Sequence, residues 1–141
     1  MAIVHELVNN VVYEVALAPV VVADNTAQAG NIIDMQGFQH VTFVALTGTL
    51  ADVDATFAWT ITHGDQSNLG DGAAADTGSL VGTLAGAAFD FSADNTTKKI
   101  GYTPGKGAGK RYVRATITPS ANAGNAPLAI VAVKLPMMTP A

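Results

Sequence analysis

Apolar and polar residues alternate most strictly at residues 55–63, which form the clearest predicted strand. Phe57, Trp59 and Ile61 are separated there by threonine and alanine, the period-two pattern of a strand with one buried face. We therefore expect Trp59 to pack in a core rather than to bind a ligand. Residues 111–119 repeat the pattern, with valine, alanine and isoleucine on the inner face and tyrosine, arginine and threonine on the outer face.

Two further segments carry apolar residues on both faces. In residues 39–47 both alternating sets contain large apolar side chains, so we expect a strand in the middle of its sheet. Residues 127–135 are apolar on both faces except at Lys134. Shorter strands are predicted at residues 19–23, 31–35, 87–91 and 98–103.

Turn signals separate nearly all of these strands. They are Asp24-Asn25, Gln36-Gly37, Asp94-Asn95, Pro104-Gly105 and residues 122–125. Many short strands with frequent turns are typical of sandwiches and barrels. We predict an all-β protein built as an antiparallel β-sandwich, with a jelly roll as one form that it could take. At 141 residues the chain fits one domain, placed at residues 18–141 behind an N-terminal arm at 1–17.

The N-terminal segment is apolar at helical spacing, but it is rich in valine and contains Asn9-Asn10, so its propensity disfavours a long helix. We expect one short turn and then an extended arm from Val11 to Leu17. This arm could pair with another subunit, or it could be an ordinary edge strand of its own sheet. Its candidate contact residues are Ile3, Val4, Leu7, Val8, Val11 and Val12.

Residues 64–86 are rich in glycine, alanine and aspartate and offer little to pack. We expect a long surface excursion that is mobile unless a partner orders it. Its acids loosely imitate a calcium loop, but Leu69 fills a ligand place and helices on both sides are missing. A solvated loop is the simpler interpretation, and weak cation binding by Asp65, Asp71 and Asp76 stays open.

Acidic and basic side chains are completely separated along the chain. The 11 acids lie between Glu6 and Asp94, and the 7 bases lie between Lys98 and Lys134. Attraction must therefore act between distant parts of the chain or between neighbouring copies. Only 13% of residues are charged while 49% are hydrophobic, against about 25% charged in typical domains. Such a surface is expected to be covered by partner subunits, unless the alanine and glycine content simply gives ordinary exposure.

The sequence lacks the residues that most kinds of catalytic or cofactor-binding site require. Cysteine is absent, which excludes disulfides, thiolate metal sites and cysteine nucleophiles. His5, His40 and His63 lie on separate segments without metal-ligand spacing. Residues 105–111 resemble a phosphate-binding loop, but Pro104 replaces its first glycine and a strand follows instead of a helix. We expect no enzyme, no cofactor and no metal.

A basic cluster follows residue 97, at Lys98, Lys99, Lys106, Lys110, Arg111 and Arg114. We expect a positively charged hairpin over residues 98–114. Because the net charge is −4, a subunit-facing or solvated edge fits better than nucleic-acid binding. The longest apolar run, residues 15–23, is too short to span a membrane and contains Pro19. The N-terminus has no basic region of a secretory signal.

Five segments follow one another in a familiar order: residues 34–50, 56–63, 99–105, 109–119 and 128–135. The most specific is 109–119, which reads Gly-Lys-Arg-Tyr-Val-Arg-Ala-Thr-Ile-Thr-Pro. Together they resemble small structural proteins of tailed bacteriophages, typically capsid decoration (cement) proteins, over about residues 15–135. The chain departs from that pattern by the insertion Pro-Gly-Lys-Gly-Ala at 104–108, which leaves the contacts of that tip open.

The resemblance implies a β-sandwich that docks on the outside of a capsid shell and stabilises it, without catalysis. It implies the major capsid protein as partner, a homo-oligomer (dimer or trimer), assembly in the host cytoplasm and a final place on the virion surface. From the negative net charge and the short apolar runs we expect contact with neither nucleic acid nor membrane. The N-terminal arm and the basic cluster are the expected interfaces. Two alternatives stay open: a tail or neck component, and a glycan-binding adhesion module using exposed aromatics such as Tyr13, Tyr102 or Tyr112.

Overall fold

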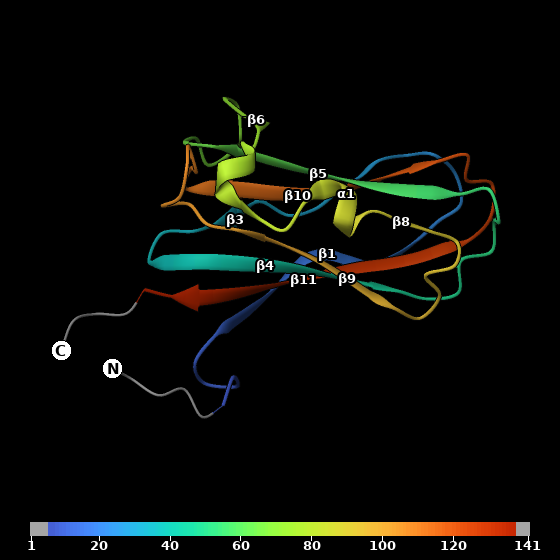
Figure 1. Cartoon of the computed structure of the whole chain (residues 1–141), viewed down its shortest axis with the longest axis horizontal. Helices are drawn as coiled ribbons and strands as arrows, with labels where there is room; N and C mark the ends of the chain where they lie inside the picture. The colour runs from blue at the N-terminus through green and yellow to red at the C-terminus, as the bar shows by residue number, and fades with distance from the viewer. Residues whose placement is uncertain (1–5, 138–141) are drawn as a thin grey trace.

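The computed structural model describes residues 6–137 and consists of two antiparallel sheets packed face to face (Figure 1). The five-stranded sheet has the spatial order β1 (Val12–Val22), β11 (Ala126–Pro136), β4 (Phe38–Thr47), β9 (Thr97–Tyr102) and β7 (Leu80–Val81). The six-stranded sheet has the order β2 (Gln28–Ala29), β10 (Tyr112–Ser120), β5 (Thr56–Gly64) and β6 (Ala73–Ala74), while β3 (Ile33–Asp34) pairs with β10 and β8 (Phe89–Asp90) pairs with β5. The predicted all-β sandwich is confirmed.

Strands pair from the two ends of the chain inward. The first strand, β1, pairs with the last, β11; β2 and β3 pair with β10; β4 pairs with β9; and β5 pairs with β6 and β8. The pairs β4–β11 and β5–β10 then join these hairpins into two sheets. A long nested hairpin wrapped into two sheets is the connectivity of a jelly roll.

The four strands with the strongest sequence patterns are present as β5, β4, β10 and β11. As expected for a strand without a polar face, β4 lies between β11 and β9 in the middle of its sheet. Trp59 is buried, and its indole N–H donates to the carbonyl of Ala87 at 2.8 Å. The inner faces of both sheets supply the core, including Phe43, Ile61 and Ile117.

Of the two forms left open for residues 11–17, the structure shows the edge strand of the chain's own sheet from Val12 onward, so the separate arm placed at residues 1–17 is wrong for residues 12–17. This stretch is the first half of β1, which pairs with β11 from Val12 onward. Pairing satisfies backbone groups that a free apolar strand would leave to water, so the strand belongs to the sheet of its own chain. The boundary placed at residue 17 therefore falls inside a strand, while Ile3 and Val4 lie outside the described residues.

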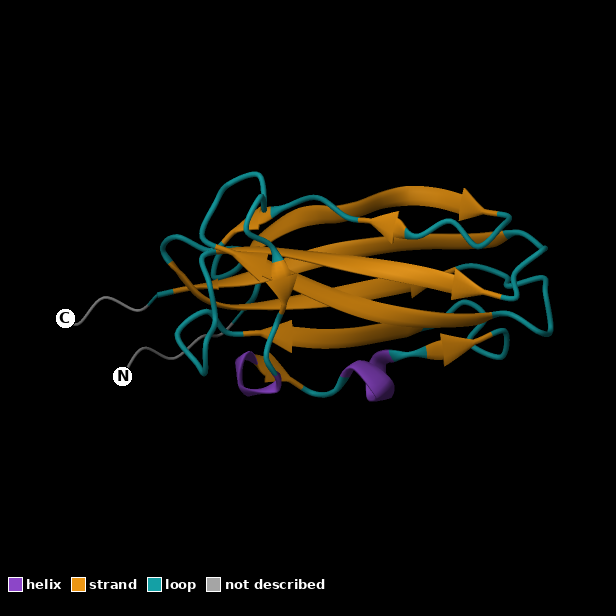
Figure 2. Cartoon of the chain, turned by 90° about the horizontal axis from the view of Figure 1, so that it is seen from above, coloured by secondary structure: helices purple, strands orange, loops and turns teal. Residues whose placement is uncertain are grey.

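The segment 64–86 carries more secondary structure than expected. It includes β6, the 3₁₀ helix η1 (Thr77–Ser79), β7 and the start of α1 (Leu84–Ala87). The two short helices lie along one side of the sandwich (Figure 2). Leu80 is buried and its backbone pairs with Tyr102, Ser79 is fully buried, and the N–H of Ala75 donates to the carbonyl of Ile61 at 2.8 Å. Several residues therefore hold this segment to the core.

Candidate functional site

The outer face of the five-stranded sheet is apolar over β1 and β11 and mixed, with threonine, His40 and Lys99 among the outward residues, over β4 and β9. Cross-strand partners point to the same face, and Val131 pairs with Val15 on one side and with Val44 on the other. We call this surface the apolar face. Its outward residues are Tyr13, Val15 and Val21 on β1; Pro127, Ala129, Val131, Val133 and Leu135 on β11; His40, Thr42, Val44 and Leu46 on β4; Thr97, Lys99 and Gly101 on β9; and Val81 on β7.

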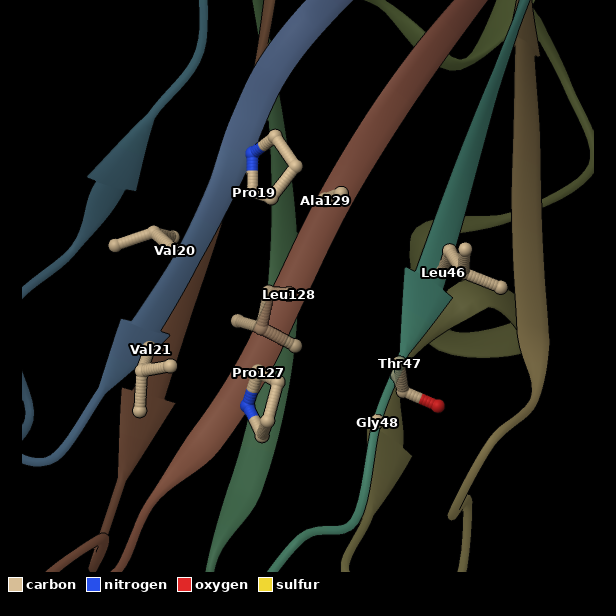
Figure 3. A pocket seen from close by; sticks show the side chains of 9 residues that line it. All are labelled: Pro19, Val20, Val21, Leu46, Thr47, Gly48, Pro127, Leu128 and Ala129. Carbon is tan, nitrogen blue, oxygen red and sulfur yellow. The ribbon is translucent and has the colours of Figure 1, made fainter.

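One end of the apolar face is hollowed into a shallow groove of about 360 Å³. Its walls come from β1, β11 and β4 (Figure 3), and they are formed by Pro19, Val20, Val21, Leu46, Thr47, Gly48, Pro127, Leu128 and Ala129. Only Thr47 among these has a polar side chain, and that hydroxyl is already bound to the carbonyls of Ala93 and Thr96. The groove thus offers apolar contact area and no side-chain chemistry.

The outer face of the six-stranded sheet is different. It presents Thr56, Ala58, Thr60 and Thr62 on β5, and Tyr112, Arg114, Thr116, Thr118 and Ser120 on β10. Hydroxyl-rich positions of this kind are the usual solvent face of an antiparallel sheet. The two outer faces of one sandwich therefore differ in kind, and the apolar one is the candidate interaction surface.

Charge is nearly absent from the apolar face. Among the outward positions named above, Lys99 is the one charged side chain, and His40 is held between Thr42 and Thr103 through ring nitrogens 3.0 and 2.9 Å from their hydroxyls. Burial lowers the pKa of His40, so its ring favours the neutral form. A partner that covered this face would bury little charge.

The predicted basic hairpin at residues 98–114 is wrong. Its two strands, β9 and β10, lie in opposite sheets, and the loop between them crosses from one sheet to the other. The six bases consequently point to different places. Lys99 is on the apolar face, whereas Arg114 is on the outer face of the six-stranded sheet. Lys98 is opposite buried Ala45 in the pairing of β9 with β4, and Lys106 is exposed in the loop. Lys110 and Arg111 form ion pairs with aspartates.

The charges that the sequence separates meet inside the chain. Each ion pair found among the described residues joins an early acid to a late base: Lys110 to Asp65 at 3.4 Å, Arg111 to Asp34 at 2.9 Å, and Lys134 to Glu14 at 2.6 Å. The Arg111 guanidinium holds the pKa of Asp34 below its ordinary value. These three pairs show that attraction between early acids and late bases acts within one chain, so they need no second copy.

Four of the six N-terminal contact candidates, Leu7, Val8, Val11 and Val12, lie in the described part of the chain, either on the turn before β1 or at the start of β1. Leu7 and Val8 are exposed on the turn before β1, where the two residues are 58% and 78% accessible. Val11 is half-buried and Val12 begins β1. The turn is held by Glu6, whose carboxylate accepts from the backbone N–H of Asn9 at 2.9 Å. These apolar residues therefore stand at the edge of the sheet rather than on a separate arm.

A polar cluster that the sequence did not indicate lies at the end of the sandwich. The ring of buried His63 is 2.9 Å from the hydroxyl of Tyr102, which donates to the carbonyl of Lys110 at 2.8 Å. Burial raises the pKa of Tyr102 to about 12, so its hydroxyl stays protonated and serves as a hydrogen-bonding group. The cluster fastens the loop between β9 and β10 to both sheets.

The aspartates of residues 64–86 are engaged separately. Asp71 accepts from the backbone N–H of Asp65 at 2.9 Å, and Asp76 accepts from that of Ala108 at 3.2 Å. Within residues 6–137 no group of three or more His, Cys, Asp or Glu side chains is arranged to hold a metal ion. Of the aromatic candidates for a glycan site, Tyr102 is buried in the core, Tyr112 is half-buried on β10 and Tyr13 is exposed.

Acid is expected to destabilise the fold through His63. Burial lowers the pKa of His63 below 6.5, and nearby Asp76 opposes this only in part. Near pH 6.5 the histidine therefore binds a proton in the unfolded chain but stays neutral in the folded chain. The contribution of His63 to the free energy of unfolding is fully present above that pH and decreases below it. The slope for one such group reaches at most about 1.4 kcal/mol per pH unit.

Urea unfolding at pH 7.5, 6.0 and 5.0 measures this effect. The variant His63→Gln should lose less stability on acidification than the wild type, while keeping the smaller contribution of the same sign from His40. Equal losses in the two proteins would show that His63 is not responsible.

The whole-chain comparisons leave the family open. The sequence matches no known family model and no curated protein. No helix within the described part of the chain is long and apolar enough to cross a membrane.

Proposed function

We propose that this chain is a structural protein of a tailed bacteriophage, a capsid decoration protein that binds the outside of the head and stabilises the shell. The observation that carries the proposal is the apolar face, a broad and almost uncharged sheet surface opposite an ordinary hydroxyl-rich one. The resemblance to phage structural proteins points to the same function. Its most specific element, residues 109–119, forms most of β10.

The apolar face suits a binding partner that is large and fixed. A specific interface typically buries about 800 Å² on each partner, and the apolar face extends over two strands of eleven residues, one of ten and one of six. Apolar burial is worth about 25 cal/mol per Å² before the costs of association are subtracted. Several copies bound across neighbouring shell subunits would then resist the loss of any one of them.

Charge has a smaller part in this function than the sequence suggested. Lys110, Arg111 and Lys134 are paired within the chain. Lys99 stands on the apolar face itself, where it could orient the protein against an acidic group of the shell. Exposed pairs of this kind contribute about 0–1 kcal/mol each, so affinity would come from apolar contact and orientation from Lys99.

A charge placed in the middle of the apolar face should abolish head binding. Val131 lies between Val15 and Val44, so Val131→Glu would bury an unpaired carboxylate under the shell. We expect binding to heads purified from a deletion mutant of the phage to weaken about 100-fold or more, equivalent to roughly 2.7 kcal/mol. The measurement is the number of copies bound per head after sedimentation.

The matched control is Thr116→Glu on the outer face of the six-stranded sheet, opposite Thr60. It should bind heads like the wild type. Equal binding by both variants would reject the apolar face as the docking surface. Binding of the wild type to purified tails, and not to heads, would instead support the tail or neck alternative.

A further inference from the structure

The sandwich has one long open strand edge. Among the described residues, each sheet ends in strands of two residues except at β1, which has eleven. An open edge presents unpaired backbone N–H and C=O groups that another strand can bind. Short edge strands are a common protection against this, and β1 lacks it.

Part of the β1 edge is nevertheless blocked. Pro19 has no N–H to offer, and Asn31 covers the middle of the strand, donating from its side chain to the carbonyl of Val15 at 2.9 Å and from its backbone to that of Ala16 at 2.6 Å. Within residues 6–137, the stretch from Val12 to Glu14 has β11 on one side and no strand on the other. The accessible edge is therefore the N-terminal end of β1.

This open stretch is also where exposed apolar side chains concentrate. Tyr13 and Val15 are 52% and 54% accessible on the outer side, and exposed Leu7 and Val8 precede them on the turn. Edges that stay unpaired usually carry lysine or another free charge. Between residues 7 and 15 the only charged side chain is Glu14, and Lys134 binds its carboxylate at 2.6 Å.

We propose that this edge pairs with the same edge of a second copy of the chain. The two β1 strands run antiparallel about a two-fold axis at Tyr13, so that the interface is formed twice from one set of residues. The carbonyl of Val15 faces away from β11 toward Asn31, and by the alternation of an antiparallel ladder the backbone groups of Tyr13 face the open edge as well. Two tyrosines then meet across the axis on the apolar face.

The charges permit this arrangement. Glu14 lies next to the axis in both copies, and its pairing with Lys134 removes the repulsion that two bare carboxylates would create. The two five-stranded sheets become one continuous sheet, and their apolar faces lie side by side. Association of the chain with itself does not depend on the proposed function, because it needs no capsid.

A single introduced cysteine tests the pairing, because the chain has none of its own. Residues opposite each other in an antiparallel pair have Cα atoms about 4.5–5.5 Å apart, which is within disulfide range. Under mild oxidation Tyr13→Cys should form a covalent dimer at least about 10-fold faster than Val21→Cys. Val21 is the matched control because it is on the same strand and similarly exposed, but beyond Pro19.

Sedimentation equilibrium of the unmodified chain supplies the second measurement. An interface this small is at the weak end of specific association, so dimers should appear on the order of 10–100 µM. Tyr13→Lys should weaken dimerisation at least about 10-fold while Val21→Lys leaves it unchanged. Equal cross-linking rates of the two cysteine variants would overturn the proposal, and so would a monomer mass at all concentrations up to about 500 µM. A larger loss of dimerisation in Val21→Lys than in Tyr13→Lys would also overturn it, since the contact would then lie at the end of β1 that borders the groove.

Discussion

Replacing Lys134 by alanine is expected to lower the free energy of unfolding by about 3 kcal/mol. The side chain is on the inner side of β11 and only 7% accessible. Its ammonium group lies 2.6 Å from the carboxylate of Glu14, 3.2 Å from the carbonyl oxygen of Asp34 and 4.0 Å from the ring centre of Phe38. Alanine would remove all three contacts and leave a cavity.

Replacing Lys134 by methionine separates packing from charge. Methionine fills much of the same volume, and replacing a buried ion pair by apolar groups is often nearly neutral, because desolvation offsets most of the attraction. Glu14 is 43% accessible, so its carboxylate can return to water. We therefore expect Lys134→Met to lie within about 1 kcal/mol of the wild type.

Urea denaturation at constant pH, with the slope compared among the three proteins, measures both changes. If methionine cost as much as alanine, the ion pair itself would hold β1 to β11 and the cavity would matter little. That result would also strengthen the role of Lys134 in keeping the β1 edge uncharged.

Replacing Gly30 by alanine is expected to cost about 2–3 kcal/mol. This residue stands where the chain passes between the two sheets, with its N–H donating to Ala115 of β10 at 2.9 Å. A β-carbon here would lie 2.8 Å from the Ala115 carbonyl oxygen and closer still to that of Ala16 on β1. Both obstacles are backbone atoms of paired strands, so neither can move without disturbing a sheet.

Gly105→Ala is the matched control, because a β-carbon at Gly105 would meet nothing within 4 Å. Its effect should stay within about 0.5 kcal/mol. Thermal and urea unfolding of both variants provide the comparison. A Gly30→Ala protein as stable as the control would mean that β1 can shift away from residue 30, and the edge geometry used for the dimer would need revision.

Local pattern predicted the strands of this protein well. Alternation at residues 55–63 and 111–119 identified β5 and β10 together with their buried faces, since a period of two is imposed by the strand itself. The two-sided apolar pattern of residues 39–47 placed β4 in the middle of a sheet. The same property in residues 127–135 contributes to the apolar face, which forms only because β11 and β4 are neighbours in one sheet.

The pairing of strands that are far apart in the chain could not be predicted from the sequence. Residues 98–114 looked like a hairpin because two strands follow each other across a turn, yet β9 and β10 bind opposite sheets. For residues 12–17 the sequence left both an arm and an edge strand open, because nothing local shows that β11, more than a hundred residues later, is their partner. Which aspartate meets Arg111 depends on the same long-range order, and so does the burial of Lys134.

By itself the sequence determined that this chain forms short antiparallel strands around one core, and that two of those strands have no polar side. Those properties depend on side-chain alternation over a few residues. Only the tertiary structure decided which strands are neighbours, which charges meet, where glycine is required and which edge stays open. These depend on the nested order of pairing, and contacts between residues far apart in the chain leave no local periodicity from which they could be read.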